Sequence, residues 1–214
     1  MKKQNYDVFR SYLFKNIDYI GELEIPILHS SYLLPNRLIS FSKALKTKDY
    51  NQWVHFYEND ETILRVWRNP KKYLPILKKF YGVISPDFSI HRNMSLFMQI
   101  QSIFNGRVLG NYWQQNGIEV IANVRFNDSR TYKFAFEGID KNANISIGSL
   151  GCLKKNEERK FFVAGLEEMM KTLTPKNLIV YGSAPEEIFD RYKNNTNIIQ
   201  FPSQISKIYA NKVI

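Results

Sequence analysis

Four short apolar runs, separated by segments with helical spacing, constrain the fold of this chain more than any other feature. They begin at Gly82, Ile118, Ile145 and Leu178, and each ends in polar residues or glycine. Apolar runs of this length without alternation are typical of parallel strands that are buried on both faces. Because the carboxyl ends of parallel strands meet at one edge of a sheet, where α/β folds place their ligands, the sequence predicts one edge that gathers functional side chains.

Two further apolar runs, beginning at Trp53 and Ile198, extend the series to about six strands. Apolar periodicity predicts helices that begin near residues 60 and 70 and helices over 94–115 and 157–173. We therefore expect an α/β fold with mostly parallel strands, either as an incomplete barrel or as an open doubly wound sheet. A complete eight-unit barrel typically needs about 250 residues, and this chain has 214. Residues 131–138 fit either a short helix or an extra strand.

The first fifty residues differ from the rest of the chain. Pro26 interrupts the apolar stretch Leu23–Leu34 and Pro35 ends it, which predicts an extended arm rather than a helix. We expect residues 1–52 to form an N-terminal arm packed on the core and residues 53–214 to form a single α/β domain.

The charge of the chain is strongly positive. Thirty lysines and arginines against twenty acidic residues give a net charge of +10 and a pI of about 9.5. This excess favours nucleic acid, acidic proteins or anionic lipid as partners, although surface lysines also serve solubility alone. The sequence shows neither a signal peptide nor an apolar run long enough to span a membrane, and one cysteine excludes an internal disulfide. These features predict a cytoplasmic protein with no membrane partner.

Asp87 is the first candidate functional residue at the predicted edge. It follows an apolar strand and a proline, and Arg92 lies five positions later. A carboxylate at this place can act as a general base or bind a metal ion, and Arg92 can bind a phosphate or carboxylate group. The alternative is that Asp87 only caps the following loop.

The densest charged group at the edge contains Asn123, Arg125, Asp128 and Arg130. Two arginines suit phosphate binding, and Asp128 suits either the orientation of a guanidinium group or catalysis as a base or metal ligand. An equal alternative is that Asp128 caps a turn and that the ion pair only fixes the loop.

The loop Gly148–Cys152 connects a predicted strand to a predicted helix. Ser149 and Gly151 are candidates for anion binding, because backbone amides at a helix start can hold an anion. The glycine spacing matches neither a Rossmann fingerprint nor a P-loop. Cys152 is a candidate nucleophile, but a buried structural thiol is the stronger expectation.

Aromatic and basic side chains supply the remaining candidates. Tyr132 is a candidate ligand contact, and it could stack on bases together with Tyr57, Tyr181 and Phe126, although aromatic residues at strand ends usually complete a core. One face of the helix that begins near residue 70 carries four candidates for contacts to a nucleic-acid backbone: Lys71, Lys72, Lys78 and Lys79.

The sequence identifies no cofactor. The three histidines and the single cysteine lack zinc-type spacing. A Mg²⁺ site that uses Asp87, Asp128 or Asp140 is compatible with the sequence but requires these carboxylates to converge in space.

Several strings, taken together and in order over residues 53–183, resemble a known family, the domain of unknown function 4417. They are 54–57 (VHFY), 65–70 (RVWRNP), 77–80 (LKKF), 85–89 (SPDFS), 123–125 (NVR), 128–132 (DSRTY), 138–139 (GI) and 180–182 (VYG). The resemblance implies carriage by phages, plasmids and their bacterial hosts, and it brings no activity with it. The chain departs from the family pattern at Ser149–Leu150, where family members often have Thr-His, and at Ala122, Asn93 and Lys133.

Three functional hypotheses follow from these observations. The first is a mobile-element accessory protein that binds nucleic acid or another polyanion through an arginine-rich rim. The second is a metal-assisted enzyme acting on a nucleotide or phosphorylated substrate, with Asp87 or Asp128 as the base or the metal ligand. The third is a phage-borne inhibitor that docks on a host defence or replication protein.

Overall fold

A computed structural model gives the structure of the chain and describes residue 7 and residues 9–203. Seven strands form its main sheet, and they are β3 (Leu38–Ser40), β4 (Trp53–His55), β5 (Gly82–Ile84), β6 (Val120–Asn123), β7 (Asn144–Gly148), β8 (Asn177–Tyr181) and β9 (Asn197–Phe201). All neighbouring strands of this sheet pair in parallel. The predicted class, α/β with parallel strands, is confirmed.

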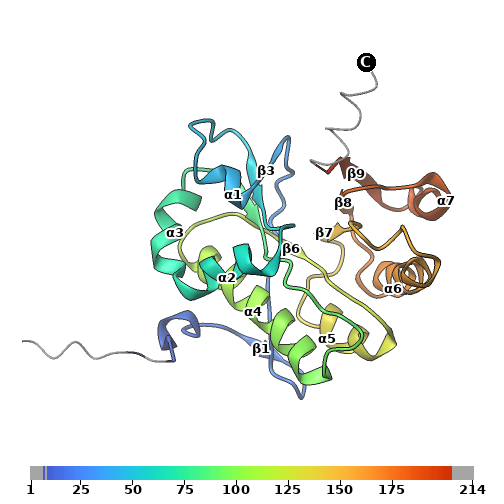
Figure 1. Cartoon of the computed structure of the whole chain (residues 1–214), viewed down its shortest axis with the longest axis horizontal. Helices are drawn as coiled ribbons and strands as arrows, with labels where there is room; N and C mark the ends of the chain where they lie inside the picture. Colours follow the sequence, from blue (N-terminus) through green and yellow to red (C-terminus); the bar gives the residue numbers. More distant parts are fainter. Residues whose placement is uncertain (1–6, 8, 204–214) are drawn as a thin grey trace, which may run out of the picture.

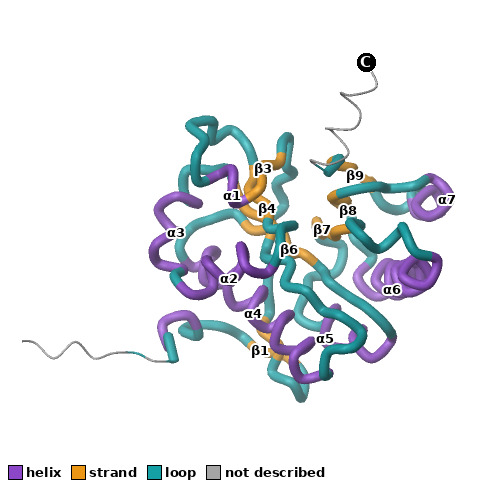
Figure 2. Tube along the Cα trace, viewed as in Figure 1, coloured by secondary structure: helices purple, strands orange, loops and turns teal. Residues whose placement is uncertain are grey.

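The order of the strands in the sheet is the order of the strands in the chain, from β3 to β9. A doubly wound sheet contains a point at which the strand order reverses, and this sheet has none. The sheet instead curls into a half-barrel, with the strands in an arc and the helices around its outside (Figures 1 and 2). The incomplete barrel is therefore the correct one of the two expected arrangements.

Helices connect the strands and cover the convex face. They are α1 (Phe41–Ala44), α2 (Asp60–Arg68), α3 (Pro70–Leu77), α4 (Leu96–Gln115), α5 (Tyr132–Phe136), α6 (Asn156–Leu173) and α7 (Glu186–Phe189). Asn59 caps α2, because its side chain accepts a hydrogen bond from the Thr62 amide at 3.0 Å. The undecided segment 131–138 contains α5. Within the described residues, no helix has the length and apolar character that crossing a bilayer requires.

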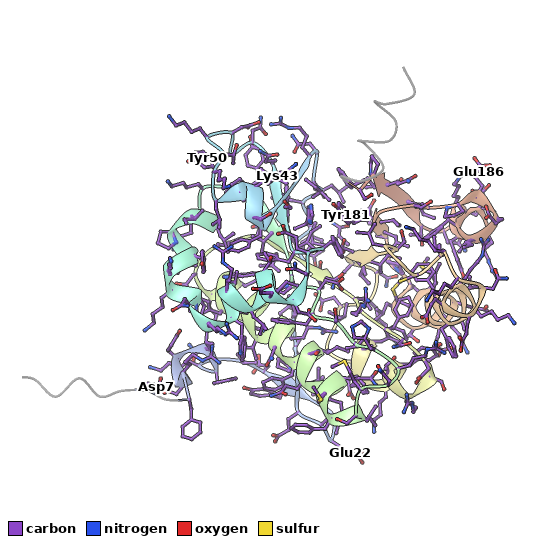
Figure 3. All side chains as sticks on the ribbon, viewed as in Figure 1. Asp7, Glu22, Lys43, Tyr50, Tyr181 and Glu186 are labelled. Carbon is purple, nitrogen blue, oxygen red and sulfur yellow. The ribbon has the colours of Figure 1, made fainter. Side chains whose placement is uncertain are left out.

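The two faces of the sheet are filled differently. Val54, Val83 and Leu178 are fully buried in the large apolar core shared with the helices. The concave face has a separate cluster of Trp53, Tyr57, Ile84, Ile121, Ile179 and Tyr181. Tyr57 stacks on Tyr181 with ring centroids 4.8 Å apart. Figure 3 places Tyr181 on this inner side and Glu22 and Glu186 at the periphery. The interior of the half-barrel is thus occupied by side chains, as in small closed barrels.

The N-terminal region is an arm, as expected, but it also supplies one strand. A two-stranded hairpin of β1 (Tyr19–Ile20) and β2 (Ile25–Pro26) lies in the arm. The strand β3 follows within the segment 1–52 and pairs with β4, so the sheet begins earlier than the sequence indicated. Leu38–Ser40 contains only two apolar residues and follows Pro35, Asn36 and Arg37, so it forms no readable apolar run. The division into 1–52 and 53–214 stays a prediction, and residues 1–6, 8 and 204–214 lie outside the described part.

A row of asparagines joins the amino ends of the last three strands. Asn177 Nδ2 donates to Asn144 Oδ1 at 2.7 Å, and Asn197 Nδ2 donates to Asn177 Oδ1 at 2.9 Å. Asn144 Nδ2 in turn donates to the carbonyl oxygens of Ser31 and Leu33. The row therefore ties the arm to the amino end of the half-barrel.

Candidate functional site: a pocket at the carboxyl edge of the sheet

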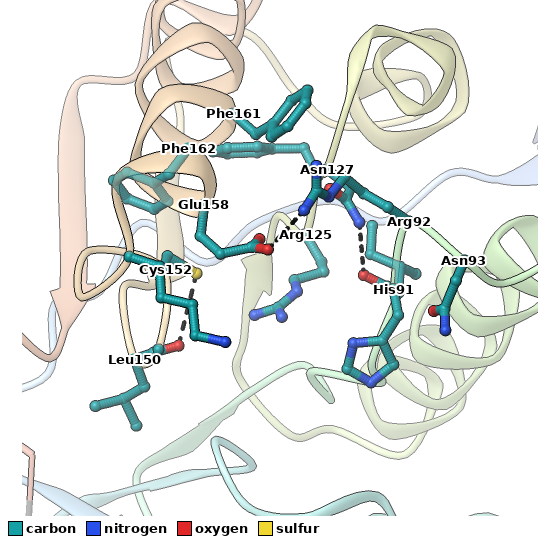
Figure 4. A pocket seen from close by; sticks show the side chains of 14 residues that line it. His91, Arg92, Asn93, Arg125, Asn127, Leu150, Cys152, Glu158, Phe161 and Phe162 are labelled. Atoms are coloured by element: carbon teal, nitrogen blue, oxygen red, sulfur yellow. Dashed lines mark hydrogen bonds and ion pairs between the residues drawn. The ribbon is translucent and has the colours of Figure 1, made fainter.

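A pocket of about 880 Å³ opens at the carboxyl edge of the sheet. We call it the rim pocket, and its walls come from the loops after β5, β6 and β7 and from the start of α6. Its lining residues are Ile90, His91, Arg92, Asn93, Arg125, Phe126, Asn127, Leu150, Gly151, Cys152, Lys155, Glu158, Phe161 and Phe162. Three of the predicted site residues, Arg92, Arg125 and Gly151, thus share one hollow. Figure 4 shows Arg125 between Cys152 on one side and His91 on the other.

Asp87 holds Arg125 in place, and Asn123 holds Asp87. Its Nη1 lies 3.3 Å from Asp87 Oδ2, and Asn123 Nδ2 donates to Asp87 Oδ1 at 2.8 Å. The Arg125 side chain is 24% exposed and that of Asp87 is 12% exposed. The nearby Asp87 carboxylate raises the pKa of Arg125, so the guanidinium group stays charged in the pocket.

The polar contacts continue from Asn123 into the interior of the half-barrel. The Tyr57 hydroxyl donates to Asn123 Oδ1 at 2.9 Å and lies 2.6 Å from Ser146 Oγ. Burial raises the pKa of Tyr57 well above its ordinary value, so this phenol stays protonated. A connected set of side chains therefore sets the position of Arg125.

Arg92 crosses the rim to helix α6. Its Nη1 donates to Glu157 and its Nη2 to Glu158, each at 2.7 Å, and its guanidinium group lies 4.4 Å from the Phe161 ring centroid. The pair with Glu158 is drawn in Figure 4. Both acids come from the first turn of α6, where the helix dipole favours negative charge. The charge of Arg92 is thereby balanced within the chain.

Arg130 is also paired. Its Nη2 donates to Asp128 Oδ2 at 2.7 Å and to the carbonyl oxygen of Arg92 at 3.2 Å. Asp128 accepts the Arg130 backbone amide as well, and the hydrogen bonds from Arg130 lower the pKa of Asp128. The structure therefore combines the two alternatives for Asp128, because the carboxylate both caps the turn and orients the arginine.

The loop after β7 brings backbone and a thiol to the pocket. Gly151 has a φ of +77°, and no atom lies within 4 Å of the place where a β-carbon would stand. Cys152 is partly buried, and this burial raises the pKa of its thiol, while Arg125 acts in the opposite direction. The Ser149 hydroxyl donates to the Ser183 carbonyl oxygen at 2.7 Å, and the predicted ligand role of Ser149 stays a prediction.

Several predicted site residues lie elsewhere. Tyr132 stacks on Phe136 and lines a different hollow beside the hairpin residue Ile20. Lys78 and Lys79 follow the end of α3 and precede β5, so they lie at the amino end of the half-barrel. A helix that returns the chain to the next parallel strand ends at the opposite edge, which separates these lysines from the rim arginines.

The other two lysines contact aromatic rings. Lys71 Nζ lies 3.9 Å from the ring centroid of Tyr12, and Lys72 Nζ lies 5.4 Å from that of Tyr73. Neither lysine lines the rim pocket. The helix lysines and the rim arginines therefore lie apart, and the binding roles predicted for both sets stay predictions.

The candidate carboxylates do not assemble a metal site. Within the described ranges, no three His, Cys, Asp or Glu side chains lie close enough together to hold an ion. Asp87 and Asp128 each face an arginine instead. A catalytic role for either residue, with or without Mg²⁺, stays a prediction.

Comparison with known sequences places this arrangement in a family. The profile of a family described as a domain of unknown function (DUF4417) matches residues 17–202. The chain belongs to the DUF4417 family. The match covers the arm hairpin, the whole sheet and every residue of the rim pocket, and it confirms the family resemblance.

Two phage proteins are similar to this DUF4417 chain. The Gene 1 protein of Mycobacterium phage D29 is 29% identical over 163 residues, which are 74% of this chain and 60% of the phage protein. The Gene 1 protein of Mycobacterium phage L5 is 29% identical over 163 residues, which are 71% of that protein. The chain thus spans about 60% of the length of the D29 relative, and its similarity to phage proteins agrees with the predicted mobile-element association.

The sequence did not reveal every residue that shapes the DUF4417 pocket. Lys155 lines it, and Glu157 and Glu158 neutralise Arg92. These acids lie 65 and 66 residues from Arg92 in the sequence, so the sequence around Arg92 gives no sign of the pairing. The one available signal was two acids at a predicted helix start beside a predicted binding edge.

Proposed function

We propose that the rim pocket binds a small phosphorylated ligand with a planar ring, of which a nucleotide is the best-fitting class. The main observation that supports this proposal is that Arg125 and Lys155 line one pocket of about 880 Å³ at the carboxyl edge of a parallel sheet. Pockets of roughly 300–1,000 Å³ accommodate ligands of this size. This function retains the predicted preference for phosphate and applies it to one compact ligand.

The cationic side of the pocket supports an anionic group. Asp87 contacts Arg125 through Nη1, and guanidinium has further donors for a bidentate contact to phosphate. Lys155 forms no ion pair with any described residue. It also occupies the N-cap position of α6 without capping the helix through its side chain, so first-turn amides lie close to the same region.

The apolar residues that line the pocket support a ring. Phe126, Phe161 and Phe162 line it together with Ile90 and Leu150. Phe126 and Phe162 pack against each other with centroids 5.8 Å apart, which holds this wall in place. Aromatic side chains of this kind stack on nucleobases without strong selectivity for one base.

Calorimetric titration with nucleoside mono-, di- and triphosphates tests this function, with the nucleoside and inorganic phosphate as separate arms. We expect a nucleotide to bind more tightly than either part, and Lys155→Ala to weaken binding roughly tenfold because it removes one charge-assisted contact. Lys154→Ala is the matched control, since Lys154 is an exposed lysine next in sequence that does not line the pocket.

The single cysteine supplies a second measurement. Cys152 lines the pocket, and a bound ligand is expected to slow its alkylation by a maleimide. The proposal fails if every nucleotide leaves both the titration and the alkylation rate unchanged at millimolar concentration.

A further inference from the structure

We infer that the opposite, amino end of the half-barrel is a surface for single-stranded nucleic acid. This inference is independent of the rim pocket, because it involves the other edge of the sheet. We define the amino-end face by five lysines and two tyrosines: Lys48, Lys78, Lys79, Lys141, Lys176, Tyr32 and Tyr81.

Topology places the five lysines on one face. Lys48 precedes β4, Lys78 and Lys79 precede β5, Lys141 precedes β7 and Lys176 directly precedes β8. Because all these strands run in parallel, the residues that lead into them lie at the same end. All five lysines are exposed.

These lysines are not neutralised within the described part of the chain. None of the five lies within 4.0 Å of a described carboxylate, whereas the rim arginines Arg92, Arg125 and Arg130 all do. The carboxylates at this end have other contacts: Asp49 pairs with Arg37, Asp140 pairs with His29, and Glu119 accepts from the Ser31 hydroxyl. No ion pair with a described residue therefore neutralises the five lysines, which leaves them able to contact a phosphate backbone.

Exposed aromatic rings lie among these cations. Tyr32 is 91% exposed and Tyr81 is 56% exposed. Tyr81 directly precedes β5, and the Ser31 amide donates to the carbonyl of Val120, which pairs with Val83 of β5. The two tyrosines are thus held a few strand spacings apart, on the order of 10 Å, which suits stacking on separate bases of one strand.

The loop that presents Tyr32 is held rigidly. Asn144 Nδ2 donates to the carbonyl oxygens of both Ser31 and Leu33, and the Leu33 amide donates to Ser31 Oγ. Leu33 and Leu34 are also exposed and extend the apolar surface beside the ring. An exposed aromatic residue on an anchored loop binds without a large ordering cost.

The combination of rings and lysines selects the partner. An acidic protein segment would use the lysines alone, and duplex DNA keeps its bases inside the stack. A single strand offers phosphates to the lysines and unstacked bases to the tyrosines. The structure therefore favours single-stranded DNA or RNA, and the two are separate arms of the test.

Fluorescence anisotropy with labelled oligothymidine and oligouridine of about 12 nucleotides measures this binding across salt concentrations from about 50 to 200 mM. We expect affinity to fall steeply with salt. The double variant Lys78→Glu/Lys79→Glu is expected to weaken binding and to make the salt slope shallower by about 1.4, the value for two lost phosphate contacts to a single strand.

Two controls separate this surface from net charge and from folding. Lys154→Glu/Lys160→Glu changes the net charge equally at the other end of the sheet and is expected to leave affinity unchanged. Tyr32→Ala is expected to weaken binding about tenfold, while Tyr32→Phe keeps the ring and the affinity. The melting temperature of each variant reports whether the fold is retained.

Each contrary result overturns the inference. Equal losses in the two lysine double variants would show attraction to net charge alone. Polyglutamate or phosphatidylglycerol vesicles that bind as tightly as the oligonucleotide, with no effect of Tyr32→Ala, would identify another partner. Displacement of the oligonucleotide by a mononucleotide that protects Cys152 would place the strand in the rim pocket instead.

Discussion

Both ends of the half-barrel carry basic residues, but the two ends differ in whether acidic side chains neutralise those residues. At the carboxyl edge, Arg92, Arg125 and Arg130 each contact an acidic side chain. At the amino end, the five lysines of the amino-end face do not. Counting cations along a sequence therefore does not locate a cationic surface, because only uncompensated charge attracts a polyanion.

Helix electrostatics explain much of this difference. Helices α2, α6 and α7 begin near the carboxyl edge and have acids in their first turns, including Asp60, Glu157 and Glu186. Helix dipoles favour acidic side chains near the N-terminus of a helix and basic side chains near its C-terminus. The first-turn acids of these helices therefore lie at the carboxyl edge, where the rim arginines also lie.

The largest effect on stability is expected from removing the ion pair between Asp87 and Arg125. Asp87→Ala leaves the partly buried Arg125 without its carboxylate, and we expect it to lower the free energy of unfolding by about 3 kcal/mol. Asp49→Ala breaks the exposed pair with Arg37 and should have a much smaller effect. Urea denaturation of both variants measures the difference, and equal losses would contradict the distinction between the two ends.

A smaller loss is expected from the row of asparagines at the amino end. Asn177→Ala removes the donor to Asn144 and the acceptor of Asn197, and leaving such buried amide groups unpaired costs about 2 kcal/mol. Asn36→Ala, at an exposed asparagine, is the control. Thermal melting compares them, and a neutral Asn177→Ala would show that the row contributes little to holding the amino end together.

Substitution of the two acids that pair with Arg92 reduces the difference in charge compensation between the two ends of the half-barrel. Glu157→Gln/Glu158→Gln leaves Arg92 uncompensated at the rim, so we expect a several-fold rise in oligonucleotide affinity at low salt. Glu61→Gln/Glu186→Gln gives the same change in net charge at two exposed acids that form no ion pair with a described residue, and it serves as the control. If both double variants behave alike, the local pairing of Arg92 does not determine where polyanions bind.

The smallest expected effect concerns pH. The hydrogen bonds from Arg130 lower the pKa of Asp128 in the folded state, so this group stabilises the fold above the ordinary value of about 3.9. That contribution is lost as the pH falls through the lowered pKa. Asp128→Asn should therefore be less stable than the parent chain at neutral pH, and the difference in stability should shrink as the pH falls below about 3.9. A destabilisation that persists unchanged in acid would assign the loss to packing.

The sheet was predictable because its strands are buried on both faces. Runs such as Leu178–Val180 contain only apolar residues, and their spacing by helical segments implied parallel pairing. The strand β3 was missed because Leu38–Ser40 is short and stands in a proline-bounded region. Closure into an arc rather than a doubly wound sheet depends on strand order, which local patterns do not encode.

The edge of the sheet at which the candidate site lies was predictable, but the pairing of its charged side chains was not. Arg125 and Asn123 share one face of a strand, and their convergence on Asp87 follows from that alternation. The pairing of Arg92 with α6 depends on residues distant in sequence. Lys78 and Lys79 are exposed, and the path of the connecting helix places them at the other end of the half-barrel.

The sequential strand order has a consequence for synthesis on the ribosome. Every strand from β4 to β9 pairs with the strand that immediately precedes it in the chain. Each newly emerged strand therefore meets an already formed edge, and no pairing requires a segment that has yet to be translated. Assembly of the arc by stepwise addition from its N-terminal side would keep only one growing edge exposed at a time.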